Sequence, residues 1–291
     1  MSSILNRFSK GAFFATAFSF ASVLTTAAQA HEPHSHAPLE CRCESHQGHH
    51  DSHGDRHQQA FDEGTPNVYA ANTLGQDHLY LVYSHNFFWS TLPRSSNPAF
   101  WLKYAPVEHL QVDLLTTLRS PFELEGAVSY QLLDERQGAP LSLTPRLSFN
   151  SRGNVVGGEL LASRFLWDDV WQLGADLRVL SNASADDFDR PVAAMGLNTT
   201  VRVWKDWHVF GDLAVPFDGE ILSERSVLWT AGLKKKIPDT PHVLTFYAGN
   251  AQEQSLSGRT IALGAGADFF RLGFIFSIDI PSLTELPARL F

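Results

Sequence analysis

From about Thr65 onward, apolar and polar residues alternate one by one in short segments that polar turns separate. Residues 122–132 are the clearest case, because their apolar and polar side chains fall on opposite faces of an extended chain. The apolar face carries Phe122, Leu124, Val128, Tyr130 and Leu132, and the polar face carries Glu123, Glu125, Ser129 and Gln131. No segment keeps the 3.6-residue period of a helix over two turns. The pattern predicts a nearly all-β domain over residues 65–291.

The alternating segments number thirteen, and turns join them in succession. They cover residues 78–88, 100–104, 110–118, 122–132, 141–150, 155–165, 171–179, 192–203, 208–217, 226–234, 242–249, 259–267 and 271–280. We predict an antiparallel up-and-down transmembrane β-barrel of about 12–14 strands, because bacterial outer-membrane barrels have an even number. Two alternatives stay open: residues 282–291 form a fourteenth strand, or two of the segments are wrongly divided.

Charges in the middle of the strands favour a membrane barrel over a soluble one, although both kinds have one apolar face. Glu123 with Glu125, and Asp176 with Arg178, lie on the polar faces of their segments, which suits a lumen lined by charge and filled with water. A barrel of this many strands is also too wide for side chains alone to fill. We therefore expect the polar faces to line the lumen, and the apolar faces, Leu177 included, to contact lipid.

Two short turns have the same form, with a tryptophan on each side of two or three turn residues. They are residues 167–171 and 204–207, and they hold four of the seven Trp residues of the chain. Outer-membrane barrels carry aromatic residues at both membrane interfaces, and they alternate short periplasmic turns with longer outer loops. Long connections such as residues 181–191 and 218–225 alternate with the short turns in this way.

The N-terminus has the form of a secretory signal peptide over residues 1–30. Arg7 and Lys10 precede an uncharged apolar stretch, and Ala28-Gln29-Ala30 is a small-residue cleavage site. The net charge of −9 argues against general nucleic-acid binding, and two Cys cannot form a disulfide framework. We expect an exported protein of the outer membrane of a Gram-negative bacterium with the bilayer as its partner; the oligomeric state stays open.

Residues 31–64 are rich in histidine and nearly free of apolar side chains, so we expect a disordered periplasmic tail. Eight of the thirteen His and both Cys of the chain lie within it. Imidazole and thiolate ligands bind Cu, Zn and Ni, and a flexible chain can gather several around one ion. The candidate metal ligands are His31, His34, His36, Cys41, Cys43, His46, His49, His50, His53 and His57. The alternative is a solubilising, pH-responsive tail with no dedicated metal.

The first part of the domain resembles a bacterial membrane-associated β-barrel family known only as domain of unknown function 5777. The likeness covers residues 65–87 and 102–133, with Thr73-Leu74-Gly75, Ser84-His85 and Tyr104-Ala105 at positions of the family pattern. Asn86 stands where the family usually has a basic residue, and Ala105 stands in place of glycine. The resemblance implies an exported barrel and implies no activity.

No common hydrolase, metalloprotease or nucleotide-binding motif occurs, so we predict that the protein is not an enzyme. Ser84 and His85 are residue types of a lipase site, but neighbours in a strand point to opposite faces. We predict an outer-membrane barrel of transport or structural type, with a tail that captures metal. A metal-sequestering protein that the barrel only anchors is the second hypothesis, and an outer-membrane lipase is the third.

Overall fold

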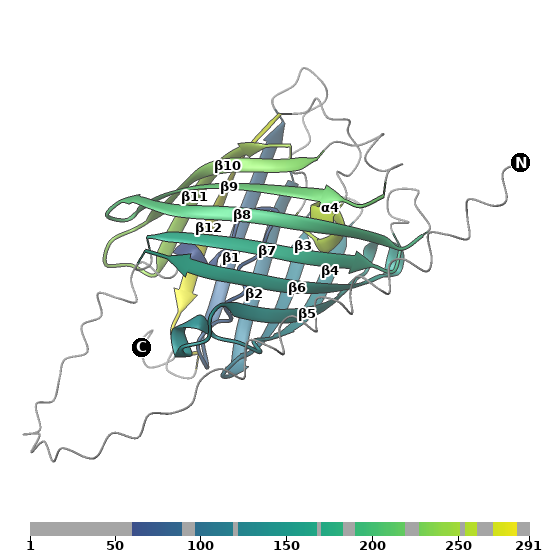
Figure 1. Ribbon diagram of the computed structural model, residues 1–291. Helices are drawn as coiled ribbons and strands as arrows, with labels where there is room; N and C mark the ends of the chain where they lie inside the picture. Colours follow the sequence, from purple (N-terminus) through teal and green to yellow (C-terminus); the bar gives the residue numbers. More distant parts are fainter. Residues whose placement is uncertain are drawn as a thin grey trace, which may run out of the picture. The chain divides into compact units, whose positions relative to one another are not determined.

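The computed structural model describes residues 60–88, 97–118, 122–167, 170–182, 190–218, 227–250, 254–260 and 270–283. The predicted signal peptide, the predicted tail as far as residue 59 and residues 284–291 lie outside the described residues. Twelve antiparallel strands, each paired with its neighbours in the sequence, form a closed barrel (Figure 1). β1 pairs with β12, beginning at Leu79 opposite Ile280, and this pairing closes the ring. The prediction of an up-and-down β-barrel is confirmed.

The strands are eight to thirteen residues long. They are β1 (Leu79–Phe88), β2 (Asn97–Val107), β3 (Leu110–Thr117), β4 (Glu123–Tyr130), β5 (Ser142–Asn150), β6 (Val155–Leu166), β7 (Trp171–Leu180), β8 (Val192–Trp204), β9 (Trp207–Pro216), β10 (Leu228–Lys236), β11 (His242–Gly249) and β12 (Arg271–Ile280). Short helices are η2 (Glu135–Gln137), η3 (Arg152–Asn154) and α4 (Leu256–Thr260). Among the described residues, no helix is both long enough and apolar enough to span a bilayer.

The prediction of a strand over residues 259–267 is wrong at residues 259–260, which are the part of this segment that the structure describes. Residues 256–260 form α4, and all five of its residues are buried, whereas a barrel strand exposes every second residue. A strand of the barrel has an outward face that contacts lipid, and α4 has no exposed residue that could form such a face. Removing this segment leaves twelve strands, so neither a fourteenth strand nor a divided segment is needed to give an even number.

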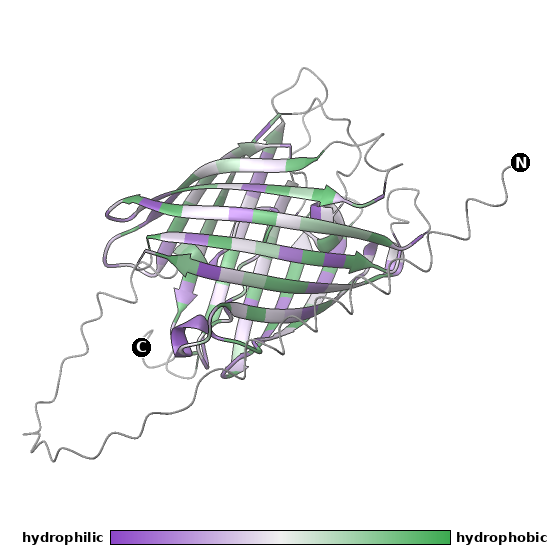
Figure 2. Cartoon of the chain, viewed as in Figure 1, coloured by the Kyte–Doolittle hydropathy of each residue, from purple (hydrophilic) through white to green (hydrophobic). Residues whose placement is uncertain are grey.

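On strands such as β4 and β7, apolar residues are exposed on the outside and polar residues are buried inside. On β7, Leu177 is 43% exposed, whereas Asp176 and Arg178 beside it are 3% and 0% exposed. Glu123 and Glu125 on β4 are buried as well. Hydrophobic and hydrophilic bands therefore alternate along each strand (Figure 2). The predicted faces are confirmed, since the polar side lines the lumen.

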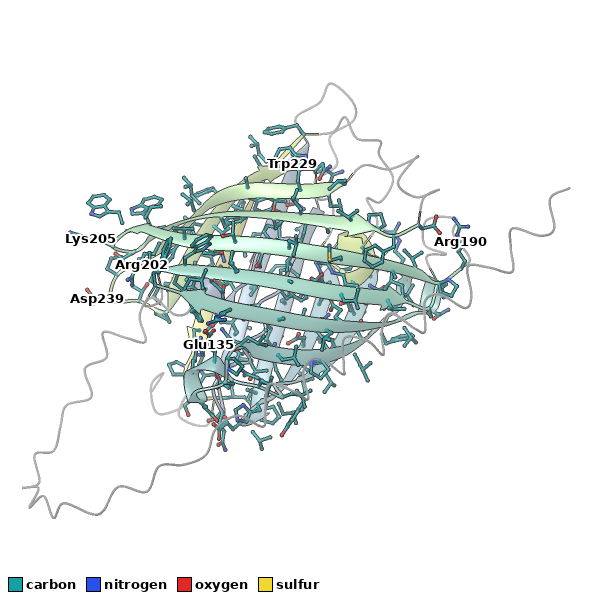
Figure 3. All side chains as sticks on the ribbon, in the orientation of Figure 1. Glu135, Arg190, Arg202, Lys205, Trp229 and Asp239 are labelled. Atoms are coloured by element: carbon teal, nitrogen blue, oxygen red, sulfur yellow. The ribbon has the colours of Figure 1, made fainter. Side chains whose placement is uncertain are left out.

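Exposed aromatic residues mark the two ends of the barrel. At the end of the short turns, which we call the short-turn end, these are Tyr130, Trp167 and Trp204. At the opposite end, the long-loop end, they are Phe87, Phe122, Phe149, Phe217, Trp229 and Phe270. Figure 3 shows Arg202, Lys205 and Asp239 at the short-turn end and Arg190 at the other. An apolar band between two girdles of aromatic residues, one at each end of the barrel, is the surface that a bilayer requires.

Candidate functional site: a filled lumen

The barrel is wide enough to hold more than its own side chains. Twelve strands about 4.8 Å apart and tilted by about 40° enclose a backbone radius of about 12 Å. Two other parts of the chain occupy this space. One is residues 60–74, which we call the luminal segment, and the other is α4, in the loop between β11 and β12. In Figure 1, α4 lies behind β8 and β9, and it contacts both strands.

The luminal segment enters and leaves at the short-turn end. Phe61 lies edge-on to Phe165, near the end of β6, with ring centroids 5.3 Å apart. Asn67 reaches the middle of β9, where its Nδ2 donates to Asp212 Oδ1 over 2.6 Å. The chain then returns, and Thr73 Oγ1 donates to Gln131 Oε1 over 2.8 Å just beyond β4. Residues 60–64, which we assigned to the disordered tail, thus have defined places inside the barrel, because partners on distant strands hold them.

A tight turn lets the luminal segment reverse direction. Gly64 has a φ of +66°, and a Cβ there would lie 2.5 Å from the backbone nitrogen of Ala70. The backbone nitrogen of Thr65 donates to the carbonyl of Val68 over 2.7 Å. Glycine adopts positive φ without strain, so residue 64 suits this position.

Buried polar groups of the barrel wall hold the luminal segment. Lys234 Nζ donates to the carbonyl oxygen of Ala60 over 2.7 Å and also to that of Gly64. Glu63 Oε1 accepts from the Tyr80 hydroxyl over 2.6 Å. Hydrogen bonds to charged groups each stabilise a structure by about 1.5–3 kcal/mol, and water can replace them when the partners separate.

The helix α4 fits against the wall because one position of β6 has no side chain. Leu256 packs between Val155 and Leu180, and a Cβ on Gly157 would lie only 1.9 Å from Leu256 Cδ2. The backbone nitrogen of Leu256 donates to Glu125 Oε2 over 2.7 Å. A shape fit and a hydrogen bond to a buried carboxylate therefore fix α4.

A network of buried ion pairs lies between α4 and the strands β3 to β7. Glu159 is its centre: it pairs with Arg146, with Arg178 Nε at 3.7 Å and with Arg259 Nη2 at 2.9 Å. The other members are Asp113 and Glu125, each 3.3 Å from Arg146, and Asp176, 2.5 Å from Arg178. Four carboxylates thus face three guanidinium groups, of which only Arg259 belongs to α4.

The luminal segment and the α4 loop meet at Tyr69. Its hydroxyl donates to the carbonyl oxygen of Gln254 over 2.9 Å, and its ring centroid lies 3.7 Å from the Arg259 guanidinium carbon. Burial raises the pKa of the Tyr69 hydroxyl to about 12, so the ring is a neutral phenol. Because the luminal segment comes from the short-turn end and α4 from the long-loop end, these contacts join the two insertions across the lumen.

Two further features of the lumen bear on what it can hold. An apolar strip that includes Val82, Trp101 and Ile275 lies on β1, β2 and β12, and the same buried cluster includes Tyr69 of the luminal segment and Leu161 of β6. A cavity of 480 Å³ opens beside the luminal segment, with Lys103 and Arg146 in its lining. Ligand pockets commonly have about 300–1,000 Å³, so the cavity has room for a small solute.

The ten predicted metal ligands, His31 to His57, all lie outside the described residues, so the tail site stays a prediction. Within the described residues, no group of three His, Cys, Asp or Glu side chains could hold a metal ion. Ser84 faces the lumen, whereas His85 lies against the outward Phe87 at a centroid distance of 4.1 Å. The two residues therefore lie on opposite faces, as predicted.

The sequence analysis did not predict the luminal segment or α4. One feature that could have indicated the luminal segment is that residues 60–75 are less polar than the tail before them, since they contain Phe61, Val68, Tyr69 and Leu74. No pattern identifies α4, because Arg259 and its neighbours alternate over a short distance as a strand would.

Solved structures with a similar fold are outer-membrane porins and channels. The KdgM porin has a TM-score of 0.50 at 12% identity, with 68% of this chain and 98% of that chain covered. The KdgM porin in complex with disordered oligogalacturonate gives 0.51 at 11% identity, with the same coverage. The COG4313 outer membrane channel from Pseudomonas putida F1 gives 0.45 at 13% identity, with 74% and 99% covered. This chain shares with the KdgM porin the fold of a closed antiparallel β-barrel.

No protein-family model matches the chain, and no curated protein matches it. The resemblance to domain of unknown function 5777 therefore stays a prediction. At 11–13% identity, likeness to the porins concerns the fold alone.

Proposed function

We propose that the protein is an outer-membrane channel for small polar solutes, and that the luminal segment and α4 together form its gate. The observation that carries this proposal is the polar, ion-paired boundary between the gate and the barrel wall. Lys234, Asp212 and Glu159 all bind the gate from the wall, and all are buried. Such groups regain hydrogen bonds to water when the gate withdraws, so the open lumen is a stable aqueous surface.

A barrel that only anchors a tail has no need of this interior. Charged groups buried inside a protein are costly unless they are paired, and apolar side chains fill a lumen with less risk. The apolar strip around Trp101 covers only part of the wall, and the strands from β3 to β7 carry the charges instead. The interior is thus organised for contact with water and solute.

Location in the outer membrane supports the same function. The apolar band, the two aromatic girdles and the predicted signal peptide all agree with insertion in that membrane. The porin fold supports transport over anchoring, and one similar porin was solved with oligogalacturonate. We infer no saccharide substrate from that title, because the likeness is one of fold.

The experiment is single-channel recording of the full-length protein in planar bilayers. We expect brief openings from the wild type, and longer openings from Lys234→Met, which removes the ammonium group that binds Ala60 and Gly64. Lys235→Met is the matched control, since Lys235 Nζ lies 5.0 Å from the Trp207 ring centroid and does not bind the gate. If wild type and Lys234→Met never conduct, the transport function is refuted and anchoring is favoured.

A metal-capturing tail is the second candidate function. The density of ligands favours it, because eight His and two Cys lie within 27 residues. A tail of this kind would serve the channel as a periplasmic scavenger, or it would be the principal function of an anchored protein. Metal titration of a tail deletion, described below, tests it independently of conductance.

A further inference from the structure

We infer that the lumen contains a binding site for an organic cation of the guanidinium class, and that Arg259 of the gate occupies this site as a tethered stand-in for the solute. The inference deepens the proposed function, on which its transport part rests. It begins from the surroundings of one buried side chain in α4.

The Arg259 guanidinium group contacts both the barrel wall and the luminal segment, in the way that a bound ligand contacts its site. Its Nη2 lies 2.9 Å from Glu159 Oε1, and its central carbon lies 3.7 Å from the Tyr69 ring centroid. Both Arg259 and Glu159 are 5% exposed or less. A carboxylate and an aromatic face are the two groups that bind guanidinium ions most effectively in a desolvated site.

The fit of Arg259 is incomplete. Its Nη1 has no hydrogen-bond partner among the described residues, although the side chain is fully buried. A structural ion pair that served only stability would be expected to satisfy this donor as well. The unsatisfied donor indicates that the pocket around the guanidinium is not shaped only to hold Arg259.

The charge balance of the wall requires a cation when α4 withdraws and the luminal segment, which carries Tyr69, stays in place. Arg259 then leaves with α4, and four carboxylates remain beside Arg146, Arg178 and Lys103, whose ammonium group lies 5.2 Å from the Tyr69 ring centroid. Removing one partner of a buried ion pair leaves an uncompensated charge and is strongly unfavourable. A cationic solute that takes the place of Arg259 restores the balance, so solute binding favours the withdrawn position of α4.

The chemistry of the site selects an organic cation over a metal ion. Hard metal ions need several oxygen ligands, and the described residues offer no such group. The Tyr69 ring instead favours a delocalised cation, and Trp101 lies edge-on to Tyr69 with centroids 6.1 Å apart. The apolar strip next to the site would contact a short hydrocarbon body. The solute class is therefore a small guanidinium or substituted ammonium compound with an apolar part.

The test uses the full-length Arg259→Ala protein in planar bilayers with methylguanidinium as the probe. We expect this variant to conduct persistently, and methylguanidinium to reduce its current with half-maximal effect at millimolar concentration, while equal Na⁺ does not. A tethered group acts at an effective concentration in the millimolar range, which sets this scale. Adding Glu159→Gln, or Tyr69→Leu, to Arg259→Ala should weaken the effect about tenfold or more.

Arg190→Ala is the matched control, because Arg190 pairs with Asp218 over 3.1 Å at the long-loop end, where Figure 3 labels it. This control should neither conduct persistently nor respond to the probe. An Arg259→Ala channel whose current ignores methylguanidinium, or responds equally with Glu159→Gln, overturns the inference and leaves the channel function standing.

Calorimetric titration of detergent-solubilised Arg259→Ala with methylguanidinium tests the binding site separately from conduction, in case no variant conducts. If no variant conducts, the channel function fails, and millimolar binding that Glu159→Gln abolishes still supports the site. Absence of both current and binding overturns the site as well. Faster migration of unheated samples in detergent gels verifies that each variant is folded, and Arg259→Lys provides a charged alternative if Arg259→Ala is not.

Discussion

Gly157 on β6 is the position at which a single methyl group should displace the gate. A Cβ there would lie 1.9 Å from Leu256 Cδ2, 3.1 Å from Leu180 Cδ2 and 3.2 Å from Ser148 Oγ. Leu256 is 1% exposed, so its side chain has little room to rotate away. Overpacking of a well-filled site costs about 1–3 kcal/mol. Because α4 belongs to a loop and β6 belongs to the barrel, we expect Gly157→Ala to move α4 and leave the barrel assembled.

A cost of this size should change the ratio of open to closed channels by about 5–150-fold. The assay is the open probability in single-channel recordings, together with the rate at which trypsin cleaves at Arg259. Both quantities should rise in Gly157→Ala. Gly158→Ala is the matched control, since its Cβ would meet only Leu147 Cδ2, at 3.8 Å.

The double variant Gly157→Ala, Leu256→Ala tests the mechanism, because shortening Leu256 makes space for the new methyl group. The two substitutions should therefore be less than additive in open probability. Open probability and trypsin cleavage that stay at wild-type values in Gly157→Ala would refute the account of how α4 is held.

Two further predictions concern the lipid face and the tail. Leu177→Arg should destabilise the barrel in lipid vesicles by about 2–4 kcal/mol in urea unfolding, whereas Gln131→Arg in the lumen should loosen only the contact with Thr73; equal costs would mean that the two faces are reversed. Deleting residues 31–57 should abolish Cu²⁺ and Zn²⁺ binding in calorimetric titration and leave barrel stability unchanged. Wild-type affinity should fall from pH 7.5 to pH 5.5, because free imidazole with a pKa of about 6.5 gains a proton over that range; undiminished binding by the deletion variant would rule the tail out as the ligand.

The sequence allowed the barrel to be predicted because each strand encodes its two faces locally. Residues 122–132 show the alternation without reference to any other part of the chain, and β4 lies within that range. Placing Glu123 and Glu125 in the lumen followed from the same alternation. Their partners did not follow, because Arg146 reaches Glu125 from another strand.

The gate could not be predicted for a related physical reason. Asn67 binds Asp212, 145 residues away, and Tyr69 binds Gln254, 185 residues away. Neither contact leaves a period in the sequence, since an inserted segment takes its conformation from the wall that surrounds it. The short alternation around Arg259 is also too brief to distinguish a strand from a turn of helix.

The central claim is that the luminal segment is a movable gate, and a reversible cross-link tests it most directly. Asn67 and Asp212 lie in hydrogen-bond contact, so Asn67→Cys with Asp212→Cys can be joined in a Cys41→Ser, Cys43→Ser background by a short bis-methanethiosulfonate, which forms a disulfide with each thiol that a reductant cleaves. We predict that the cross-linked full-length protein is silent in planar bilayers, that a reductant restores openings within the same recording, and that neither single cysteine variant responds. Openings that continue unchanged in the cross-linked protein would contradict the account.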